Sequence, residues 1–187
     1  MVQWYGARCC VGAAAIFTLR AMQEAFVKRT VVFIALALCI ATPLQAQKQW
    51  KTFAGAWFEI DYPPDFIARP SLKSTTAEGW ESAFFAAKDG SVEFYVFAPQ
   101  WSGTATDILP NDKTEIATVQ EKKGAGGAIG RLVTITARDR SYLRMYTENE
   151  ENGVKTITGI KCRDNTTYRK YKAVFEKFRL TLRQYTD

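Results

Sequence analysis

The sequence predicts an α+β domain: an antiparallel β-sheet flanked by helices, a sandwich with a C-terminal amphipathic helix packed on the sheet. Three observations favour this class. Several short segments alternate apolar and polar residues, tight-turn signals separate the later ones, and the last segment repeats aromatic residues at helical spacing. The composition, 47% hydrophobic and 24% charged over 187 residues, is typical of a globular protein.

The first 46 residues do not fit that domain. Residues 22–46 combine Lys28 and Arg29, an apolar run from Val31 to Ala41 and a small-residue ending at Ala46, the pattern of a secretory signal peptide. We expect cleavage after Ala46, a start at Met22 with residues 1–21 upstream of it, and a single domain over 47–187. The alternative is translation from residue 1 with an unusually long leader.

Export has consequences for location and charge. The apolar run is shorter than the roughly 20 residues that span a bilayer, so we expect a periplasmic or secreted protein without a transmembrane span. Removing the leader leaves 21 basic and 18 acidic residues, a net charge of +3. Such a charge in an exported protein argues against nucleic acid as a partner.

The first strands are bounded by proline and glycine. Residues 58–62 alternate as a strand that Pro63 and Pro64 must end, because proline donates no ladder hydrogen bond. The segment 68–79 is polar and predicts a loop. Residues 80–87 and 91–99 form a hairpin around Asp89 and Gly90. Its second arm is apolar except at Glu93, which predicts a central strand covered on both faces.

Further strands follow. Residues 114–124 are ambiguous between helix and strand, and their β-branched content favours a strand. Three antiparallel strands are expected over 130–139, 141–150 and 154–162, with turns near Asp139–Arg140 and Asn152–Gly153.

The C-terminal helix shows the strongest periodicity. Asn165 and Thr166 are candidate N-caps. A coiled coil would need more repeats, so we expect the helix to pack on the domain's own sheet. The apolar stripe consists of Tyr168, Tyr171, Phe175, Phe178, Leu182 and Tyr185.

The catalytic inventory is poor. The chain has no histidine, the commonest general base and metal ligand, and only Cys162 follows the leader. We therefore predict no catalytic residue, metal or cofactor. Cys162 is expected to be a buried apolar side chain at a strand end, with a reactive thiol as the alternative.

The candidate binding residues are aromatic and basic. Alternation places Tyr142, Arg144 and Tyr146 on one sheet face, with Arg138 and Arg140 across the turn. We expect the C-terminal helix to cover part of this face, with arginine stems on the tyrosines, or else a small anionic or peptide ligand to bind there.

Three more aromatic residues join this set. Trp80 and Trp101 flank the central hairpin and would mark a recognition surface if they are exposed. We expect Tyr62 to border a pocket at the end of the first strand.

Four motifs together resemble the secreted bacterial proteins of the PsbP and Mog class. The resemblance covers most of Trp57–Arg183 and implies an antiparallel sheet flanked by helices, with no catalytic residue to carry over. It also implies a role as an assembly subunit or binding adaptor. Nothing resembles the metal-handling or photosystem-docking extension of the plant members. The motifs are "FEIDYPPDF" (58–66), "FYVFAP" (94–99), "ARDRSYLRMY" (137–146) and "YKAVFEKFRLTLR" (171–183).

The expected function is that of an exported, non-enzymatic binding or accessory module of the cell envelope, which recognises a protein or a small ligand. Two alternatives stay open. One is a histidine-free hydrolase that uses paired carboxylates such as Glu59 and Asp61. The other is binding of anionic lipid or cell-wall polymer by the basic C-terminal segment, which has eight basic and three acidic residues over 161–187.

Overall fold

The computed structural model describes residues 49–124 and 128–186, which belong to one compact unit, Lys48–Asp187. The expected leader (22–46), the segment 1–21 before it and the cleavage point after Ala46 lie outside the described residues. Within the described part of the chain, no helix has the length and apolar character needed to cross a membrane.

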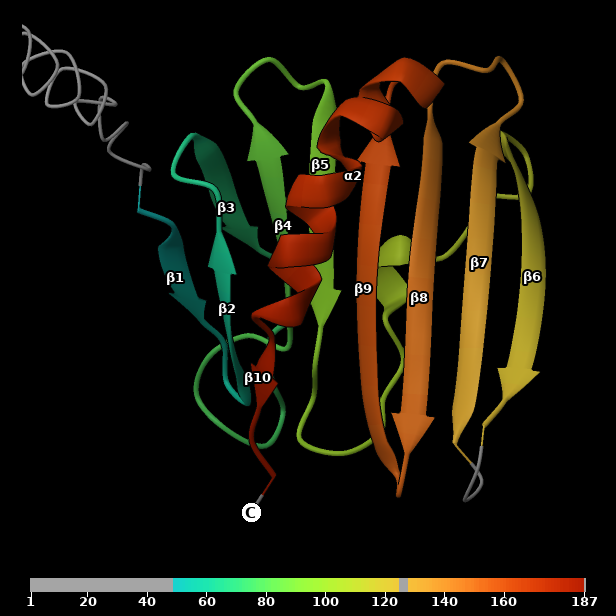
Figure 1. Ribbon diagram of the computed structural model, residues 1–187. Helices are drawn as coiled ribbons and strands as arrows, with labels where there is room; N and C mark the ends of the chain where they lie inside the picture. Colours follow the sequence, from blue (N-terminus) through green and yellow to red (C-terminus); the bar gives the residue numbers. More distant parts are fainter. Residues whose placement is uncertain (1–48, 125–127, 187) are drawn as a thin grey trace, which may run out of the picture. The chain divides into compact units, whose positions relative to one another are not determined.

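A seven-stranded antiparallel sheet forms the centre of this unit (Figure 1). This confirms the predicted fold class, and the segment that was ambiguous between helix and strand is strand β6. In spatial order the strands are β3 (Phe66–Pro70), β4 (Ser82–Ala87), β5 (Val92–Phe97), β9 (Val154–Cys162), β8 (Leu143–Glu151), β7 (Ile129–Ala137) and β6 (Glu115–Lys123).

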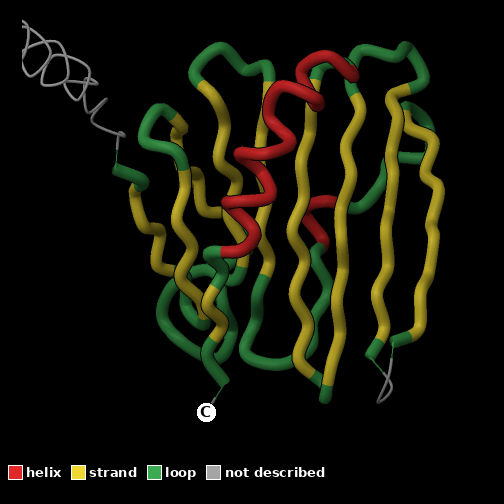
Figure 2. The backbone as a smooth tube through the Cα atoms, in the orientation of Figure 1, coloured by secondary structure: helices red, strands yellow, loops and turns green. Residues whose placement is uncertain are grey.

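Helix α2 (Asn165–Leu180) and a small second sheet cover one face of the large sheet, here called the helix face (Figures 1 and 2). The small sheet has the order β1 (Lys51–Ala54), β2 (Phe58–Tyr62), β10 (Arg183–Gln184). Sequence patterns predicted only β2. Its outer strands are four and two residues long, too short to show a period.

Aromatic side chains fill the core beneath α2. The ring of Phe178 lies 5.2 Å from that of Phe85 and 5.1 Å from that of Phe94, between centroids, and all three side chains are fully buried. Phe66, which follows the proline pair, joins the same cluster. Aromatic contacts of this kind contribute about 0.5–1.5 kcal/mol each beyond the area that they bury.

The ends of α2 differ from the prediction. Asp164 is the N-cap, and its carboxylate accepts a hydrogen bond from Thr167 N–H at 2.7 Å, so the proposal of Asn165 or Thr166 was wrong. The helix stops at Leu180. Of the two stripe residues beyond it, Leu182 still packs against the core and Tyr185 is exposed.

The opposite face of the sheet is covered by the long connection between β5 and β6, residues 98–114, which contains the short 3-10 helix η1 (Thr106–Ile108). We call this the loop face. Both faces of β5 are therefore covered, as its apolar sequence predicted. The buried members of the loop-face core are Tyr95, Phe97, Ala105, Ile108, Ile135, Tyr146 and Ile157.

The predicted turns are present. Gly90 has φ +66°, and Arg140 has φ +61° in the turn after β7. Asn152 and Gly153 have φ +52° and +76°, the left-handed pair that a two-residue hairpin turn requires. The prediction of a loop over 68–79 was wrong at its start, because the residues up to Pro70 belong to the edge strand β3.

Candidate functional site

Three of the predicted binding residues lie on the loop face: Tyr142, Arg144 and Tyr146. Arg144 is part of a buried ion pair with Glu115. The Arg144 guanidinium donates to both carboxylate oxygens of Glu115, at 2.9 and 2.5 Å. It also donates to the carbonyls of Ile108 and Leu109, at 2.9 and 3.2 Å, and to the Tyr146 hydroxyl at 3.1 Å. Helix α2 does not cover this face, so that expectation was wrong.

These contacts attach the β5–β6 connection to the sheet. Burial disfavours the charged form of Glu115, but hydrogen bonds from Arg144, Tyr142 and the Asn111 N–H outweigh it and lower the pKa of Glu115 to about 2. Every donor direction of the guanidinium is used inside the protein. Arg144 and Tyr146 therefore stabilise the fold and are not available to a ligand.

A second polar cluster fastens η1 to the sheet in the same way. The Asp107 carboxylate accepts hydrogen bonds from Tyr95 Oη and Ser82 Oγ, both at 2.7 Å. Ser82 Oγ in turn accepts from the Leu72 N–H at 2.9 Å. Burial, and then the bond to Asp107, raise the pKa of Tyr95 well above its usual value. The connection is thus held at two points on the loop face.

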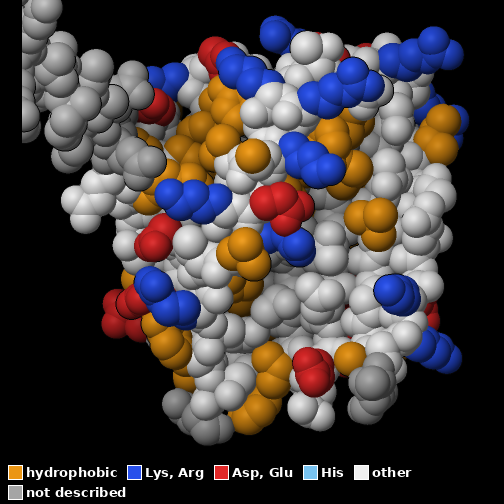
Figure 3. All heavy atoms as spheres, in the orientation of Figure 1, with side chains coloured by type: hydrophobic (Ala, Val, Ile, Leu, Met, Phe, Trp, Pro, Cys, Tyr) orange, Lys and Arg blue, Asp and Glu red, His pale blue; other side chains and the backbone are white. Residues whose placement is uncertain are grey.

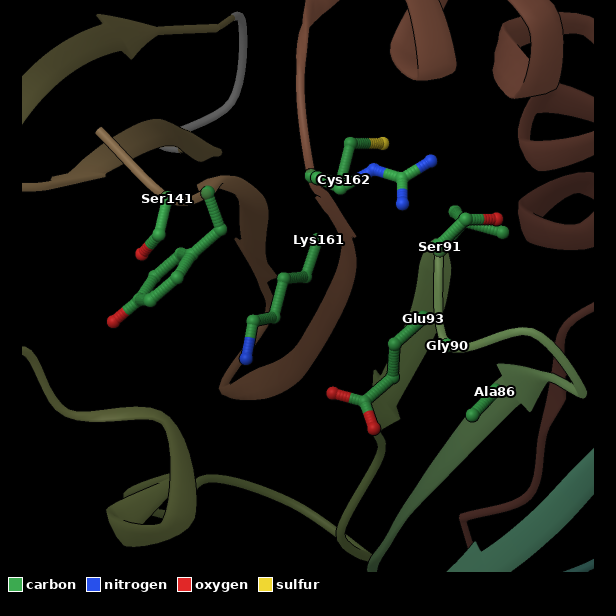
Figure 4. A pocket seen from close by; sticks show the side chains of 10 residues that line it. Ala86, Gly90, Ser91, Glu93, Ser141, Lys161 and Cys162 are labelled. Carbon is green, nitrogen blue, oxygen red and sulfur yellow. The ribbon is translucent and has the colours of Figure 1, made fainter. Parts of the chain in front are cut away.

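Beyond these points the loop face opens into a pocket of about 380 Å³ beside the β4–β5 and β7–β8 turns (Figure 4). We call it the charged pocket. Its floor is formed by the ends of β4, β5 and β9, and its walls by the two turns. The lining residues are Ala86, Gly90, Ser91, Val92, Glu93, Ser141, Tyr142, Lys161, Cys162 and Arg163.

Two opposite charges project from the floor of the charged pocket. Glu93 on β5 and Lys161 on β9 are register partners, and their side chains extend into the same open space (Figure 4). Glu93 accepts a hydrogen bond from Arg69 at 3.2 Å. The Lys161 ammonium lies 4.4 Å from the centre of the Tyr142 ring and, among residues 49–124 and 128–186, has no carboxylate within 4.0 Å.

The two turns at the rim have matching hydrogen bonds. Asp89 accepts from the N–H and hydroxyl of Ser91 at 3.0 and 2.7 Å, and Asp139 accepts from those of Ser141 at the same distances. These bonds lower the pKa of both carboxyls. Such local bonds stabilise turns. The two turns at the rim are therefore held in place by their own hydrogen bonds.

The remaining predicted residues are dispersed. Trp80 and Trp101 are exposed, at 36% and 47%, but they lie at the other end of β4 and β5 from the charged pocket. Trp101 lines a separate depression of about 520 Å³ with Asn149 and Glu151. The eight predicted residues therefore do not form one site, and only Tyr142 lines the charged pocket.

Tyr62, Arg138 and Arg140 have other surroundings. Tyr62 packs on the helix face, 4.9 Å from the Phe85 ring between centroids. Arg138 donates to the Asp112 carbonyl at 3.0 Å. Arg140 is exposed in the left-handed position of the β7–β8 turn.

The carboxylate pair considered for hydrolysis is engaged elsewhere. Glu59 and Asp61 lie on β2, and Arg183 contacts their oxygens at 3.1 and 3.9 Å. Asp61 also accepts a hydrogen bond from Thr52 at 2.7 Å. Neither residue lines the charged pocket or the Trp101 depression. In the described part of the chain, no group of three or more Cys, Asp or Glu residues is placed to hold a metal ion.

Cys162 is buried at the end of β9, as predicted. Burial, with a contribution from the negative charge of Asp164, raises the pKa of its thiol to about 11. A thiol with this pKa is a poor nucleophile near neutral pH.

The two residues at the centre of the pocket, Glu93 and Lys161, were not among the predicted binding residues. Glu93 has a local signal, because it is the one charged residue in a strand otherwise expected to be covered on both faces. Lys161 has no such local signal. Pairing the exception in β5 with its partner in β9 required the strand order, which places chain segments about 70 residues apart side by side.

No family model and no curated protein matches the chain. Among solved structures, a Synechocystis cyanobacterial PsbP is similar, with 12% identity, coverage of 74% of this chain and 94% of that chain, and a TM-score of 0.45. The Ran-binding protein Mog1p of Saccharomyces cerevisiae is similar, with 9% identity, coverage of 74% and 97%, and a TM-score of 0.41. A mutant of the protein Mog1 is also similar, with 10% identity, coverage of 74% of this chain and 97% of that chain, and a TM-score of 0.40. At these values the likeness carries no conclusion about function.

Proposed function

We propose that this protein is an exported, non-enzymatic binding module of the cell envelope and that the charged pocket is its ligand site. The observation that carries the proposal is the pair Glu93 and Lys161, which present opposite charges from the two central strands into one open pocket. Glu93 is the only residue of β5 that is not fully buried, and Lys161 follows the buried run Ile157–Ile160 of β9. We attribute the exposure of this charged pair to ligand binding.

The charges define the class of ligand. Lys161 lacks a carboxylate partner in the described structure, and a ligand carboxylate would supply one. Glu93 has only one oxygen engaged by Arg69, so its second oxygen can accept from a ligand ammonium or hydroxyl. A small zwitterion, such as an amino acid or a short peptide, satisfies both groups at once.

The pocket favours weak and selective binding. A volume of about 380 Å³ lies at the lower end of the range of small-molecule sites, which is roughly 300–1,000 Å³. Exposed ion pairs contribute about 0.2–1 kcal/mol each, so two of them give at most about 2 kcal/mol, and ring contact on Tyr142 adds about 1 kcal/mol. A total of about 3 kcal/mol corresponds to dissociation constants of about 10 mM or weaker. Such a site distinguishes ligands by the spacing of their two charges, although it binds each of them weakly.

The chemistry of the chain supports binding over catalysis. It has no histidine, its buried thiol has a raised pKa, and the Glu59–Asp61 pair is occupied by Arg183. The leader at residues 22–46, with cleavage after Ala46, supports a place in the envelope, periplasmic or secreted, where small amino compounds and peptides are available.

Calorimetric titration of the protein recovered after export tests the proposal. The probes are glycine, glycylglycine and triglycine as zwitterions, with acetate and methylamine as single-charge controls. We expect one zwitterion to bind more tightly than either control, and Lys161→Met and Glu93→Gln each to weaken that binding about two- to fivefold. Lys172→Met, which removes an exposed charge on α2, is the matched control. Equal binding by all three variants would contradict the proposal.

A further inference from the structure

The Trp101 depression, of about 520 Å³, is a second hollow of the surface, separate from the charged pocket. Three parts of the chain form it: the start of the β5–β6 connection, the β8–β9 hairpin and the end of the chain at β10. It lies at the start of β9, whereas the charged pocket lies at the end of that strand. The two hollows therefore share no residue.

Hydrogen bonds between these three parts fix the shape of the Trp101 depression. The Lys155 N–H donates to the Trp101 carbonyl at 2.8 Å. The side-chain amide of Gln184 donates to the carbonyls of Pro99 and Lys155, at 2.5 and 3.2 Å. The connection, the hairpin and β10 are thus tied to one another by bonds within the protein.

The indole ring of Trp101 is the aromatic part of the depression and is open to a ligand. It keeps 47% of its surface exposed, and within the described residues it has no aromatic or cationic neighbour and no hydrogen-bond partner for its N–H. Two other tryptophans differ. The Lys177 ammonium lies 4.4 Å from the centre of the Trp50 ring. The Trp57 N–H donates to the Thr76 hydroxyl at 2.9 Å.

Polar side chains, most of them uncharged, surround this ring. Asn149, Asn152 and Thr156 line the depression, and in the part of the chain that the structure describes their side chains make no hydrogen bonds. The amide oxygen of Gln184 likewise accepts none there. Glu151 is the only charged lining residue, and it has no ion-pair partner among residues 49–124 and 128–186. Amides and hydroxyls offer both donors and acceptors, so they match a ligand that carries both.

The sheet beside the depression is nearly free of charge on its helix face. Side chains alternate along a strand, so each of β6–β9 directs one set to the helix face and the other to the loop face. Only Lys122 and Glu151 are charged residues of these strands on the helix face. On the loop face, Glu148 contacts Arg131 and Lys155 at 3.6 and 3.0 Å. Figure 3 views the helix face, where most of the surface over β7 and β8 is white, the colour of uncharged polar side chains and backbone.

We propose that the Trp101 depression binds a neutral saccharide, with one sugar ring stacked on the indole of Trp101. A pyranose ring has an apolar C–H face that packs on an aromatic ring, and hydroxyl groups at its edge that both donate and accept. Asn149, Asn152 and Thr156 bond to these hydroxyls. The carboxylate of Glu151 accepts from a further hydroxyl.

The charges at the depression favour a neutral saccharide over other ligands that stack on tryptophan. A nucleotide or an acidic polymer would bring phosphate or carboxylate groups beside Glu151, and no lining residue is basic. The site goes beyond the proposed zwitterion site, because it uses different residues and a different class of ligand.

NMR titration of the protein recovered after export tests this site. The neutral probes are maltotriose, cellotriose and the trimer of N-acetylglucosamine. Sorbitol, a polyol without a ring, and trigalacturonate, an anionic saccharide, are the controls. At up to about 50 mM, we expect at least one neutral probe to shift the Trp101 indole N–H and the backbone amides of residues 149–156. We expect Trp101→Ala to weaken this binding at least fivefold, about 1 kcal/mol.

Three further variants separate the site from its surroundings. Trp101→Phe keeps a ring and is expected to retain part of the binding. Trp80→Ala is the matched control, because Trp80 is also exposed, at 36%, and lies outside the depression. Lys161→Met removes a charge from the charged pocket. The last two should bind the saccharide as the unaltered protein does, so the two proposed sites succeed or fail independently.

Several results would overturn the proposal. They are the absence of a shift with all three neutral probes, equal binding by Trp101→Ala and the unaltered protein, tighter binding of sorbitol or trigalacturonate than of every neutral probe, and shifts confined to the charged pocket. Thermal unfolding establishes that each variant is folded. If Trp101→Ala does not fold, the positions of the shifts in the unaltered protein still decide the question.

Discussion

Glu93 and Lys161 lie directly opposite each other on β5 and β9, yet each has a different polar neighbour: Arg69 for Glu93 and the Tyr142 ring for Lys161. Cross-strand pairs of opposite charge ordinarily contact each other. Their separation leaves a positive and a negative group facing the same pocket, which is the geometry that a zwitterionic ligand would complete.

The Arg144–Glu115 ion pair should be essential for stability. Glu115→Gln removes the counter-charge of a buried guanidinium and is expected to lower the free energy of unfolding by about 3–5 kcal/mol. Urea unfolding followed by tryptophan fluorescence measures the loss. Glu115→Leu combined with Arg144→Met should recover much of it, because no buried charge then lacks a partner. If Glu115→Gln alone were neutral, the role given to this pair would be wrong.

Acid should destabilise the protein by protonating the carboxylate of Glu115. The pKa of Glu115 is about 2 in the folded state and about 4.5 when it is unperturbed, so the unfolded chain binds its proton first as pH falls. The associated stability, on the order of 3 kcal/mol, is present above pH 5 and is lost between about pH 4.5 and 2. Urea midpoints measured from pH 7 to 2.5 check this.

The double variant that combines Glu115→Leu with Arg144→Met is the control for acid sensitivity. It should show a shallower loss of stability over the same pH interval, since the titrating carboxylate is absent. An unchanged pH profile would assign acid sensitivity to other carboxyls.

Cys162 should be inert in the folded protein. Burial and the charge of Asp164 raise the pKa of its thiol to about 11, so very little thiolate exists at pH 8. We expect alkylation of the peptide that contains Cys162, followed by mass spectrometry, to be at least a hundredfold slower than in urea-unfolded protein. Rapid labelling of the folded protein would restore the reactive-thiol hypothesis.

The helix cap provides a local stability test. Asp164→Ala should destabilise the protein by about 1 kcal/mol, because the Thr167 N–H loses its acceptor. Asn165→Ala, one position later, is the matched control and should be nearly neutral. Thermal unfolding of both variants distinguishes the cap seen in the structure from the one that the sequence suggested.

The strands β4, β5, β7, β8 and β9 were predictable because they end at turns with strong signals, whereas β6 was ambiguous and most of β3 was expected to be a loop. Asp89–Gly90 and Asn152–Gly153 both occupy the turns that were expected. The strands β1 and β10 were not predictable, since short segments acquire their structure only from pairing with β2. The N-cap was misplaced by one or two residues because aspartate, asparagine and threonine are all good caps.

The candidate site was predicted less well than the fold. Alternation correctly put Tyr142, Arg144 and Tyr146 on one face, but it could not show that residues 98–114 cover that face or that Glu115 neutralises Arg144. Those facts depend on contacts between distant parts of the chain, because Arg144 bonds to Glu115 and to the Ile108 carbonyl, which lie 29 and 36 residues away in sequence. The charged pocket also depends on the adjacency of β5 and β9, which no local pattern reveals.

The central claim, that the charged pocket binds a small zwitterion, is tested most directly by mapping backbone amide chemical shifts during titration with glycylglycine. The account predicts shifts concentrated at residues 90–93, 141–142 and 161–163, with no comparable change near Trp101. Shifts centred on the Trp101 depression, or no shift at about 50 mM ligand with any of the zwitterionic probes, would contradict it.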